Sequence, residues 1–260
     1  MFLDSQCGTP PVFRVLGVDV AAIQISGTIA QMESWIAERR RCHFIAVTGM
    51  HGVMEAQRDA AFNRALKAAD LVVPDGMPLV WIARLRGHPL RRRVYGPELM
   101  MTFCEQTNRS TRHFLYGGTT WVAESVAQVL SNRFPGFQIA GTCAPPFRSL
   151  TTTEDDEIIE RINNSGADVL WVALGTPRQE RWMCVHRDRL RIPVVVGVGA
   201  AFDFVAGKKC QAPECMRERG LEWLFRLLRE PRRLWFRYLG YGPEFIIRIV
   251  REQLSLRRSQ

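Results

Sequence analysis

Asp75 is the carboxylate of this chain best placed to act as a general base. It follows an apolar run at residues 71–73 and stands between Pro74 and Gly76, so the turn fixes it where a predicted strand ends. A carboxylate held there can accept a proton from a hydroxyl nucleophile. The alternative is a turn aspartate that bonds its own backbone, because Pro-Asp-Gly commonly forms such turns.

Two other predicted strand ends carry residues that could contact a ligand. Thr48 follows the apolar run HFIAV, although it could instead cap the next helix. Gly175 follows the run DVLWVAL, and Gln179 and Glu180 stand in the first turn of the helix after it. Free backbone N–H groups in such a turn can hold an anion, whereas a capping role would explain Glu180 equally well.

A fourth predicted strand end, residues 197–203, resembles a GxGxxG dinucleotide fingerprint but has Phe202 where the last glycine would stand. It is a weak match. The sequence contains no Walker, HExxH or GxSxG motif, so it does not favour P-loop nucleotide hydrolysis, zincin chemistry or the usual hydrolase elbow.

These strand ends belong to a chain in which short apolar runs alternate with helical segments, which is the pattern of a parallel sheet. We expect a strand-like stretch over residues 12–20 and a helical segment at about 54–69. Ligands of such sheets bind beyond the carboxyl ends of the strands. The sequence therefore predicts a Rossmann-like, doubly wound α/β domain with a mostly parallel sheet over residues 1–206, followed by a basic helical appendage over residues 207–260.

The positive charge of the chain is concentrated in this appendage. Residues 207–260 hold 13 Lys and Arg against 6 Glu, which is +7 of the net +9. Pro231 predicts a helix break near Glu230. Four arginines share one face of a helical wheel: Arg226, Arg229, Arg233 and Arg237. A basic face backed by apolar residues favours contact with phosphate groups or an anionic membrane surface, the alternative being an ordinary solvated helix face.

The composition, 47% hydrophobic, is that of a packed globular protein. No apolar run is long enough to cross a bilayer and the first residues do not resemble a secretory signal, so we expect a cytoplasmic protein. The seven cysteines form no CxxC pair, which favours reduced thiols. A basic protein that binds nucleic acid is the alternative function, but the charge is confined to one end and no helix-turn-helix or RNP-like motif occurs.

Eight blocks follow one another along the chain: TGMHG, AADLVVPDGMPLVW, RRRVYGPEL, FLYGG, FPGFQIAGT, VALGTPRQE, VGVGAAFDFVAGKKCQAP and RGLEWLFRLLREPRR. In this order they resemble the WecG/TagA/CpsF family of bacterial glycosyltransferases, over about residues 14–240. The most specific blocks are the PDG after an apolar strand and the GLEW run of the appendage.

The resemblance implies transfer of a sugar from a UDP-sugar, typically UDP-N-acetylmannosamine or its uronic acid, to a saccharide attached to a polyprenyl diphosphate. It implies inversion at the anomeric carbon, no metal and no cofactor. By position, Asp75 matches the base, Thr48 and Gln179 match donor contacts, and Arg93 matches an arginine near the site. Arg226 and Arg233 match appendage arginines that close over the diphosphate. We add Gly175 and Asp203 to the expected donor contacts.

One departure from the family pattern bears on the donor. About two residues after the equivalent of Thr48 the family usually has Asn, whereas this chain reads Gly49-Met50-His51. A neutral histidine offers one hydrogen-bond donor and one acceptor, so His51 could recognise a different sugar. UDP-glucose is therefore a candidate for the sugar nucleotide. The alternative is a loop histidine in solvent.

The charge pattern and the implied reaction fit together. An enzyme without a metal needs fixed cations or N–H dipoles to stabilise the departing UDP, and the appendage arginines can supply them. The sequence has no DxD metal motif. The same basic tail could rest on the anionic inner face of the cell membrane, which would bring the site to its lipid-linked acceptor. The sequence leaves open the acceptor sugar, the linkage and whether the chain forms a homo-oligomer.

Overall fold

A computed structural model describes residues 10–107, 109–235 and 240–258 of the chain. The expected phosphate contact Arg233 has a described backbone but its side chain lies outside the described part, as does all of Arg237. The elements before the appendage are, in chain order, β1 (Val12–Val15), β2 (Val18–Ala21), α1 (Ile25–Glu38), β3 (His43–Thr48), α2 (Met50–Ala56), α3 (Ala60–Ala68), β4 (Leu71–Pro74), α4 (Met77–Leu85), α5 (Gly96–Gln106), β5 (Arg112–Gly117), α6 (Thr120–Arg133), β6 (Gln138–Cys143), α7 (Thr152–Asn164), β7 (Val169–Ala173), α8 (Arg178–His186), β8 (Val194–Gly197) and α9 (Ala201–Val205).

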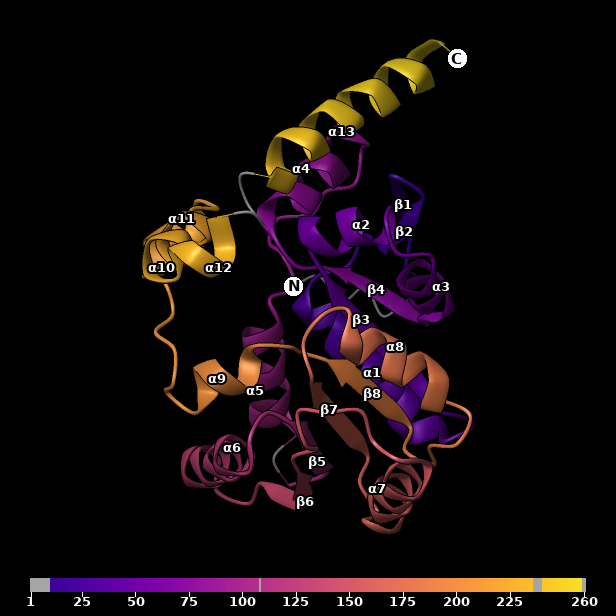
Figure 1. Cartoon of the computed structure of the whole chain (residues 1–260), viewed down its shortest axis with the longest axis vertical. Coiled ribbons are helices and arrows are strands. Elements are labelled where there is room, and N and C mark those ends of the chain that lie inside the picture. Colours follow the sequence, from indigo (N-terminus) through magenta and orange to yellow (C-terminus); the bar gives the residue numbers. More distant parts are fainter. Residues whose placement is uncertain (1–9, 108, 236–239, 259–260) are drawn as a thin grey trace, which may run out of the picture.

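Six strands form one parallel sheet in the order β4-β3-β8-β7-β5-β6. Strands β3, β4 and β8 are buried along their whole length, which explains why they read as continuous apolar runs rather than alternating ones. Helices cover both faces of the sheet (Figure 1). The doubly wound, Rossmann-like fold predicted from the sequence is confirmed.

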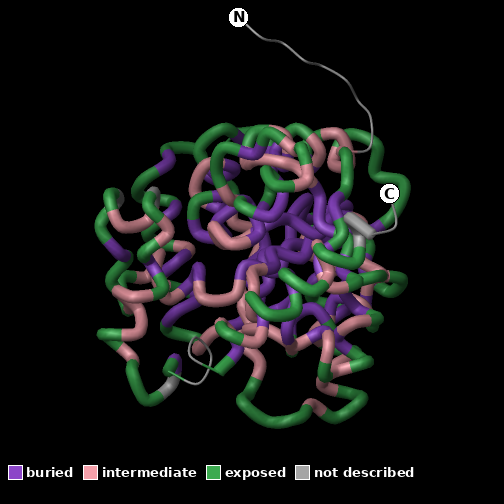
Figure 2. Tube along the Cα trace, turned by 90° about the horizontal axis from the view of Figure 1, so that it is seen from above, coloured by how far each residue is buried: buried purple, intermediate pink, exposed green. Residues whose placement is uncertain are grey.

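The core divides into two layers, one on each face of the sheet. One layer packs α2, α3, α4, α7 and α8 against the strands, and the other packs α1, α5, α6 and α9. Seen from above, the buried residues gather at the centre of the molecule and the exposed ones follow its outer helices and loops (Figure 2). The strands between the two layers hold their carboxyl ends in fixed positions, and the candidate site is built on those ends.

The structure divides two of the expected elements. Residues 12–20 do not form one strand: β1 and β2 pair antiparallel as a separate hairpin, which turns at Leu16 and Gly17, both with positive φ. The expected helix over 54–69 is two helices, α2 and α3. Asp59 starts the second, because its carboxylate accepts hydrogen bonds from the backbone N–H groups of Ala61 and Phe62.

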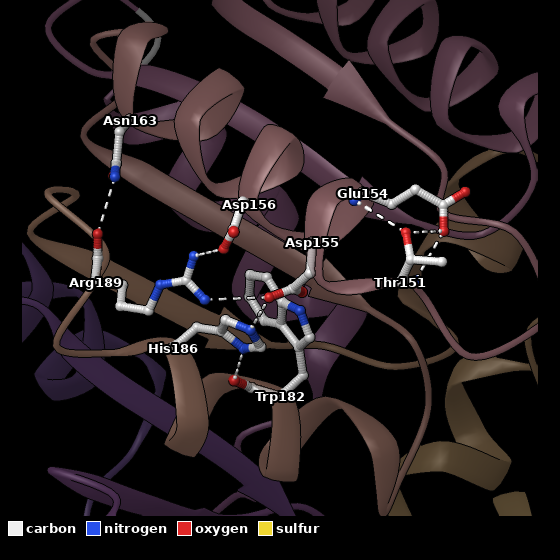
Figure 3. Close-up of polar contacts among 8 residues, drawn as sticks. All are labelled: Thr151, Glu154, Asp155, Asp156, Asn163, Trp182, His186 and Arg189. Atoms are coloured by element: carbon white, nitrogen blue, oxygen red, sulfur yellow. Dashed lines mark hydrogen bonds and ion pairs between the residues drawn. The ribbon is translucent and has the colours of Figure 1, made fainter.

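A polar cluster ties α7 to α8 on one face of the sheet (Figure 3). The Nδ1 of His186 lies 2.7 Å from the carbonyl oxygen of Trp182, and its Nε2 lies 2.8 Å from Oδ2 of Asp155. Both ring nitrogens of His186 thus lie within hydrogen-bond distance of an oxygen atom. Arg189 bridges Asp155 and Asp156.

Thr151 and Glu154 form a capping box at the start of α7, where the acidic residues of the first turn also face the positive end of the helix dipole.

The appendage consists of short helices followed by a long one: α10 (Glu214–Glu218), α11 (Glu222–Arg229), α12 (Pro231–Trp235) and α13 (Tyr241–Arg258). The break predicted near Glu230 is confirmed, since α11 ends at Arg229 and α12 begins at Pro231. Helix α13 extends away from the sheet beyond α4 (Figure 1). Within the described residues, no helix combines the length and the hydropathy that a membrane span requires.

Candidate active site

A cavity of about 810 Å³ lies at the carboxyl ends of four neighbouring strands, β4, β3, β8 and β7. Each strand contributes a residue to its lining: Asp75 after β4, Thr48 at the end of β3, Gly199 after β8 and Gly175 after β7. The remaining walls come from α2, α4, the start of α5, α9 and the appendage helices α11 and α13. The cavity is therefore where a doubly wound sheet is expected to bind its ligand.

Asp75 and Thr48 are joined through their backbones. The Asp75 N–H donates to the Thr48 carbonyl oxygen over 2.8 Å, which extends the pairing of β3 and β4 by one bond. A Cβ atom on Gly49 would lie 2.2 Å from the carbonyl oxygen of Asp75, so only glycine allows the two strand ends to approach this closely. Both segments line the cavity. The turn therefore holds Asp75 at the cavity, as the sequence suggested.

Arg93 connects Asp75 to the appendage. Its guanidinium forms a buried ion pair with Glu222 of α11 and lies 4.3 Å from the ring centroid of Tyr95. Burial by itself lowers the pKa of Arg93, but the nearby carboxylates of Asp75 and Glu222 raise it further, so the pKa stands above its ordinary value. Arg93 is therefore a permanent cation placed between two carboxylates.

Two hydroxyl groups at the cavity have unmet hydrogen-bonding capacity. Thr48 Oγ1 and the Tyr95 hydroxyl are buried, and neither has a partner among the described residues. Thr48 does not cap a helix, because the N-cap residue of α2 is Gly49. Burial raises the pKa of the Tyr95 phenol well above its ordinary value, and Glu222 and Asp75 raise it further, so the phenol stays protonated. Buried hydroxyls without partners are suited to a polar ligand such as a sugar.

Gln179 holds two strand ends together. Its Oε1 accepts from the Gly199 N–H at 3.0 Å, and its Nε2 donates to Glu180 at 2.9 Å. Glu180 is fully buried and also accepts from Thr176 Oγ1 at 2.9 Å. Gln179 lines the cavity, as expected, and these bonds fix the loops after β7 and β8 relative to each other. Gly175, with φ of +77°, begins the turn that leads into α8.

His51 stands in the first turn of α2 rather than in a solvent loop, and it lines the cavity. Its ring centroid lies 5.5 Å from that of Tyr241, the first residue of α13. The side chain is therefore held between the sheet domain and the last helix, at a position where it can meet a ligand.

The three expected residues near or in the appendage have different positions. Arg226 lines the cavity, and its guanidinium lies 5.7 Å from the ring of Phe204 and 3.9 Å from Glu222. Asp203 is not part of the cavity lining, because in α9 its carboxylate pairs with Lys209 at 3.2 Å. The structure thus does not bring Asp203 to the other predicted residues, and the position of the Arg233 side chain lies outside the described part.

Sequence reasoning missed several lining residues. Tyr95 and Glu222 stand inside the quoted blocks VYGPEL and GLEW, but nothing local indicates that they meet across Arg93. Trp81 of α4 and the side chains of α13 also line the cavity. Among the described residues, no three His, Cys, Asp or Glu side chains are grouped so that they could hold a metal ion.

Comparison with known proteins gives a consistent result. A sequence model of the glycosyl transferase WecG/TagA/CpsF family matches residues 13–259. The chain is similar to an N-acetylglucosaminyldiphosphoundecaprenol N-acetyl-β-D-mannosaminyltransferase of Bacillus spizizenii, with 27% identity over 91% of this chain and 90% of the relative. A protein of the same name from Staphylococcus aureus is 25% identical over 95% of each chain. The chain therefore belongs to the WecG/TagA/CpsF family of glycosyltransferases.

Proposed function

We propose that this glycosyltransferase moves N-acetylmannosamine, or a related hexose, from a UDP-sugar to a saccharide carried on a polyprenyl diphosphate, and that it inverts the anomeric centre. The names of the relatives support the lipid-linked acceptor and the N-acetylmannosaminyl group. The observation that carries the proposal is the placement of Asp75, Arg93 and Arg226 around one cavity at the carboxyl ends of the strands.

In the proposed reaction, Asp75 accepts the proton of the acceptor hydroxyl. The hydroxyl oxygen then forms a bond to the anomeric carbon of the donor, while the bond from that carbon to the UDP oxygen breaks on the opposite face. The electron pair of the broken bond leaves with UDP. Thr48 and Tyr95 are suited to position the sugar, because their buried hydroxyls have no other partner in the described part of the chain.

The leaving diphosphate needs positive charge nearby as its bond breaks. Among the described residues, Arg226 of α11 and Arg93 are the arginines that line the cavity. The nearby carboxylates raise the pKa of Arg93 more than burial lowers it, so Arg93 stays charged. We infer that these arginines, with Arg233 as a further candidate, do the work that a divalent cation does in other glycosyltransferases. Because the proposed acceptor is lipid-linked, the enzyme must act at a membrane surface, and we propose that this is the inner face of the cell membrane.

The test of the base is Asp75→Asn, which keeps the size of the side chain. The variant should lose at least about a hundredfold in kcat, since base catalysis contributes roughly 10²–10⁴-fold, while its affinity for UDP stays within a factor of about three. Asp188→Asn is the control, because that carboxylate is 97% exposed. Transfer by Asp75→Asn at the wild-type rate would exclude this residue as the base.

The donor is identified by a panel of UDP-glucose, UDP-N-acetylmannosamine, its uronic acid and UDP-N-acetylglucosamine, each assayed with an acceptor analogue of N-acetylglucosaminyl diphosphate. We expect transfer to persist in excess EDTA. A strict requirement for magnesium or manganese would contradict the role given to the arginines, and absence of transfer from every donor would contradict the proposed reaction.

A further inference from the structure

The outer part of the active-site cavity is apolar. Trp81 and Leu85 of α4 and Ile246 and Val250 of α13 all line it, yet they remain 48%, 75%, 63% and 51% exposed. Residues four apart on a helix lie on one face, so each helix presents a pair of apolar side chains to the same cavity. We call these four residues the apolar groove. Large apolar side chains gathered at the mouth of a cavity indicate contact with an apolar ligand.

The groove is held by specific contacts rather than by loose packing of the last helix. Glu252 of α13 accepts from Arg86 at 2.6 Å and from the Leu16 N–H at 3.0 Å. At the other end of the helix, the Tyr241 hydroxyl donates to Glu55 at 3.3 Å, and Glu244 pairs with Arg58. These polar ties fix α13 to α2, α4 and the β1–β2 hairpin, so the two walls of the groove keep their spacing.

The inner side of α13 is already used. Tyr241, Phe245 and Ile249 are buried and belong to the core layer that contains α2 and α4. The exposed positions Ile246 and Val250 therefore are not spare core residues. They face the cavity beside the buried row, where a ligand of the cavity would cover them.

One continuous cavity joins this groove to Asp75 and Arg93. Under the proposed function, the acceptor places its sugar hydroxyl at Asp75, and the lipid end of its diphosphate must leave through the cavity mouth. We propose that the apolar groove binds the first isoprenoid units of the acceptor's polyprenyl chain. This inference rests on the proposed function and adds to it a site that binds the lipid part of the acceptor.

A bilayer surface is the competing occupant, and α13 offers a direct way to separate the two. Ile247 lies on the same helix and is 53% exposed, but it is off the row of Ile246 and Val250 and does not line the cavity. A bilayer laid against α13 would meet this side chain as well. A single isoprenoid chain that leaves the cavity would follow the face of Ile246 and Val250.

The experiment uses two soluble acceptors, the ethyl and the farnesyl esters of N-acetylglucosaminyl diphosphate, assayed without vesicles or detergent. Wild-type protein should show a higher kcat/KM for the farnesyl ester. Ile246→Ser and Val250→Ser should each lose about tenfold in kcat/KM for the farnesyl ester and change less than twofold for the ethyl ester. Ile247→Ser is the matched control and should behave as wild type with both.

Ile246→Leu guards against a folding artefact, because it keeps the apolar volume and should retain the preference for the farnesyl ester. The inference is overturned if wild type shows no preference between the two esters, or if Ile246→Ser loses equally with both. It is also overturned if Ile247→Ser loses as much as the groove variants, which would assign the surface to a bilayer. Failure of wild type to transfer sugar even to the ethyl ester would instead contradict the proposed function.

Discussion

The pair formed by Arg93 and Glu222 should hold the appendage over the active site, and Glu222→Gln tests this directly. Glu222 is 5% exposed, and the Arg93 side chain is 15% exposed. Removing one partner of a buried ion pair typically costs 3–5 kcal/mol. Asp75 still faces Arg93 in the variant and compensates in part, so we take the lower end, about 3 kcal/mol, which corresponds to roughly a 150-fold change in an equilibrium constant.

The quantity to measure is the opening of α11, by hydrogen exchange of its backbone amides, with the amides of α6 as an internal reference. Glu222→Gln should raise the exchange of α11 by about two orders of magnitude, leave α6 unchanged and lower kcat/KM, because Arg226 departs with the helix. Glu230→Gln is the control. Its pair with Lys209 spans 3.5 Å between partly exposed side chains, and such pairs contribute up to about 1 kcal/mol.

A double-mutant cycle with Arg93→Gln isolates the pair itself. If Arg93 and Glu222 act through each other, the double variant should open α11 little more than either single variant does. Equal, small effects of Glu222→Gln and Glu230→Gln would refute the reasoning, since the buried pair would then be no stronger a tie than the exposed one. Additive effects of the two single variants would refute it as well.

Two further variants probe the sheet domain. His113 is fully buried and accepts from Trp171 Nε1 at 3.1 Å, and burial lowers its pKa to about 3. Neutral His113 stabilises the fold fully above pH 6.5, and this contribution is lost as the pH falls toward 3. Between pH 7 and pH 5, the unfolding free energy of His113→Gln should therefore fall by about 2 kcal/mol less than that of wild type, as measured by urea unfolding. An identical loss in both proteins would contradict this. Gly49→Ala would place a Cβ 2.2 Å from the Asp75 carbonyl oxygen. The forced backbone shift should lower kcat at least tenfold and destabilise the protein by roughly 1–3 kcal/mol. A kcat equal to that of wild type would count against the placement of Asp75.

Much of the sheet could be predicted because parallel strands buried on both faces leave a plain signal. The runs HFIAV and DVLWVAL correspond to β3 and β7, and the turn residues after them stand at the cavity. The errors arise where a short signal decides between two local structures. Residues 12–20 read as one strand although Leu16 and Gly17 turn the chain, and the cap at Asp59 divides the helix expected over 54–69. The order of the strands, which brings β8 beside β3, has no local signature.

The candidate site was predictable where it depends on strand ends and much less so where it depends on distant pairing. Asp75, Thr48 and Gln179 reach the cavity because the fold gathers the ends of their strands. Asp203 also follows a strand, but the five-residue helix α9 presents its carboxylate to Lys209. A sequence pattern specifies that a residue follows a strand, whereas the direction of its side chain depends on the turn that comes next.

The appendage shows the same limit in its charges. The sequence marks residues 207–260 as basic and suggests that their arginines face phosphate groups. Yet a buried ion pair that attaches α11 to the sheet domain is made by one of their few acids, Glu222. Its partner Arg93 lies 129 residues away, so no local pattern could indicate the pair. Because Arg93 also faces Asp75, the position of the appendage and the electrostatics at the candidate base are coupled. A ligand that draws Arg93 toward a phosphate would weaken its hold on Glu222, and binding at the cavity would thereby change how firmly α11 is docked.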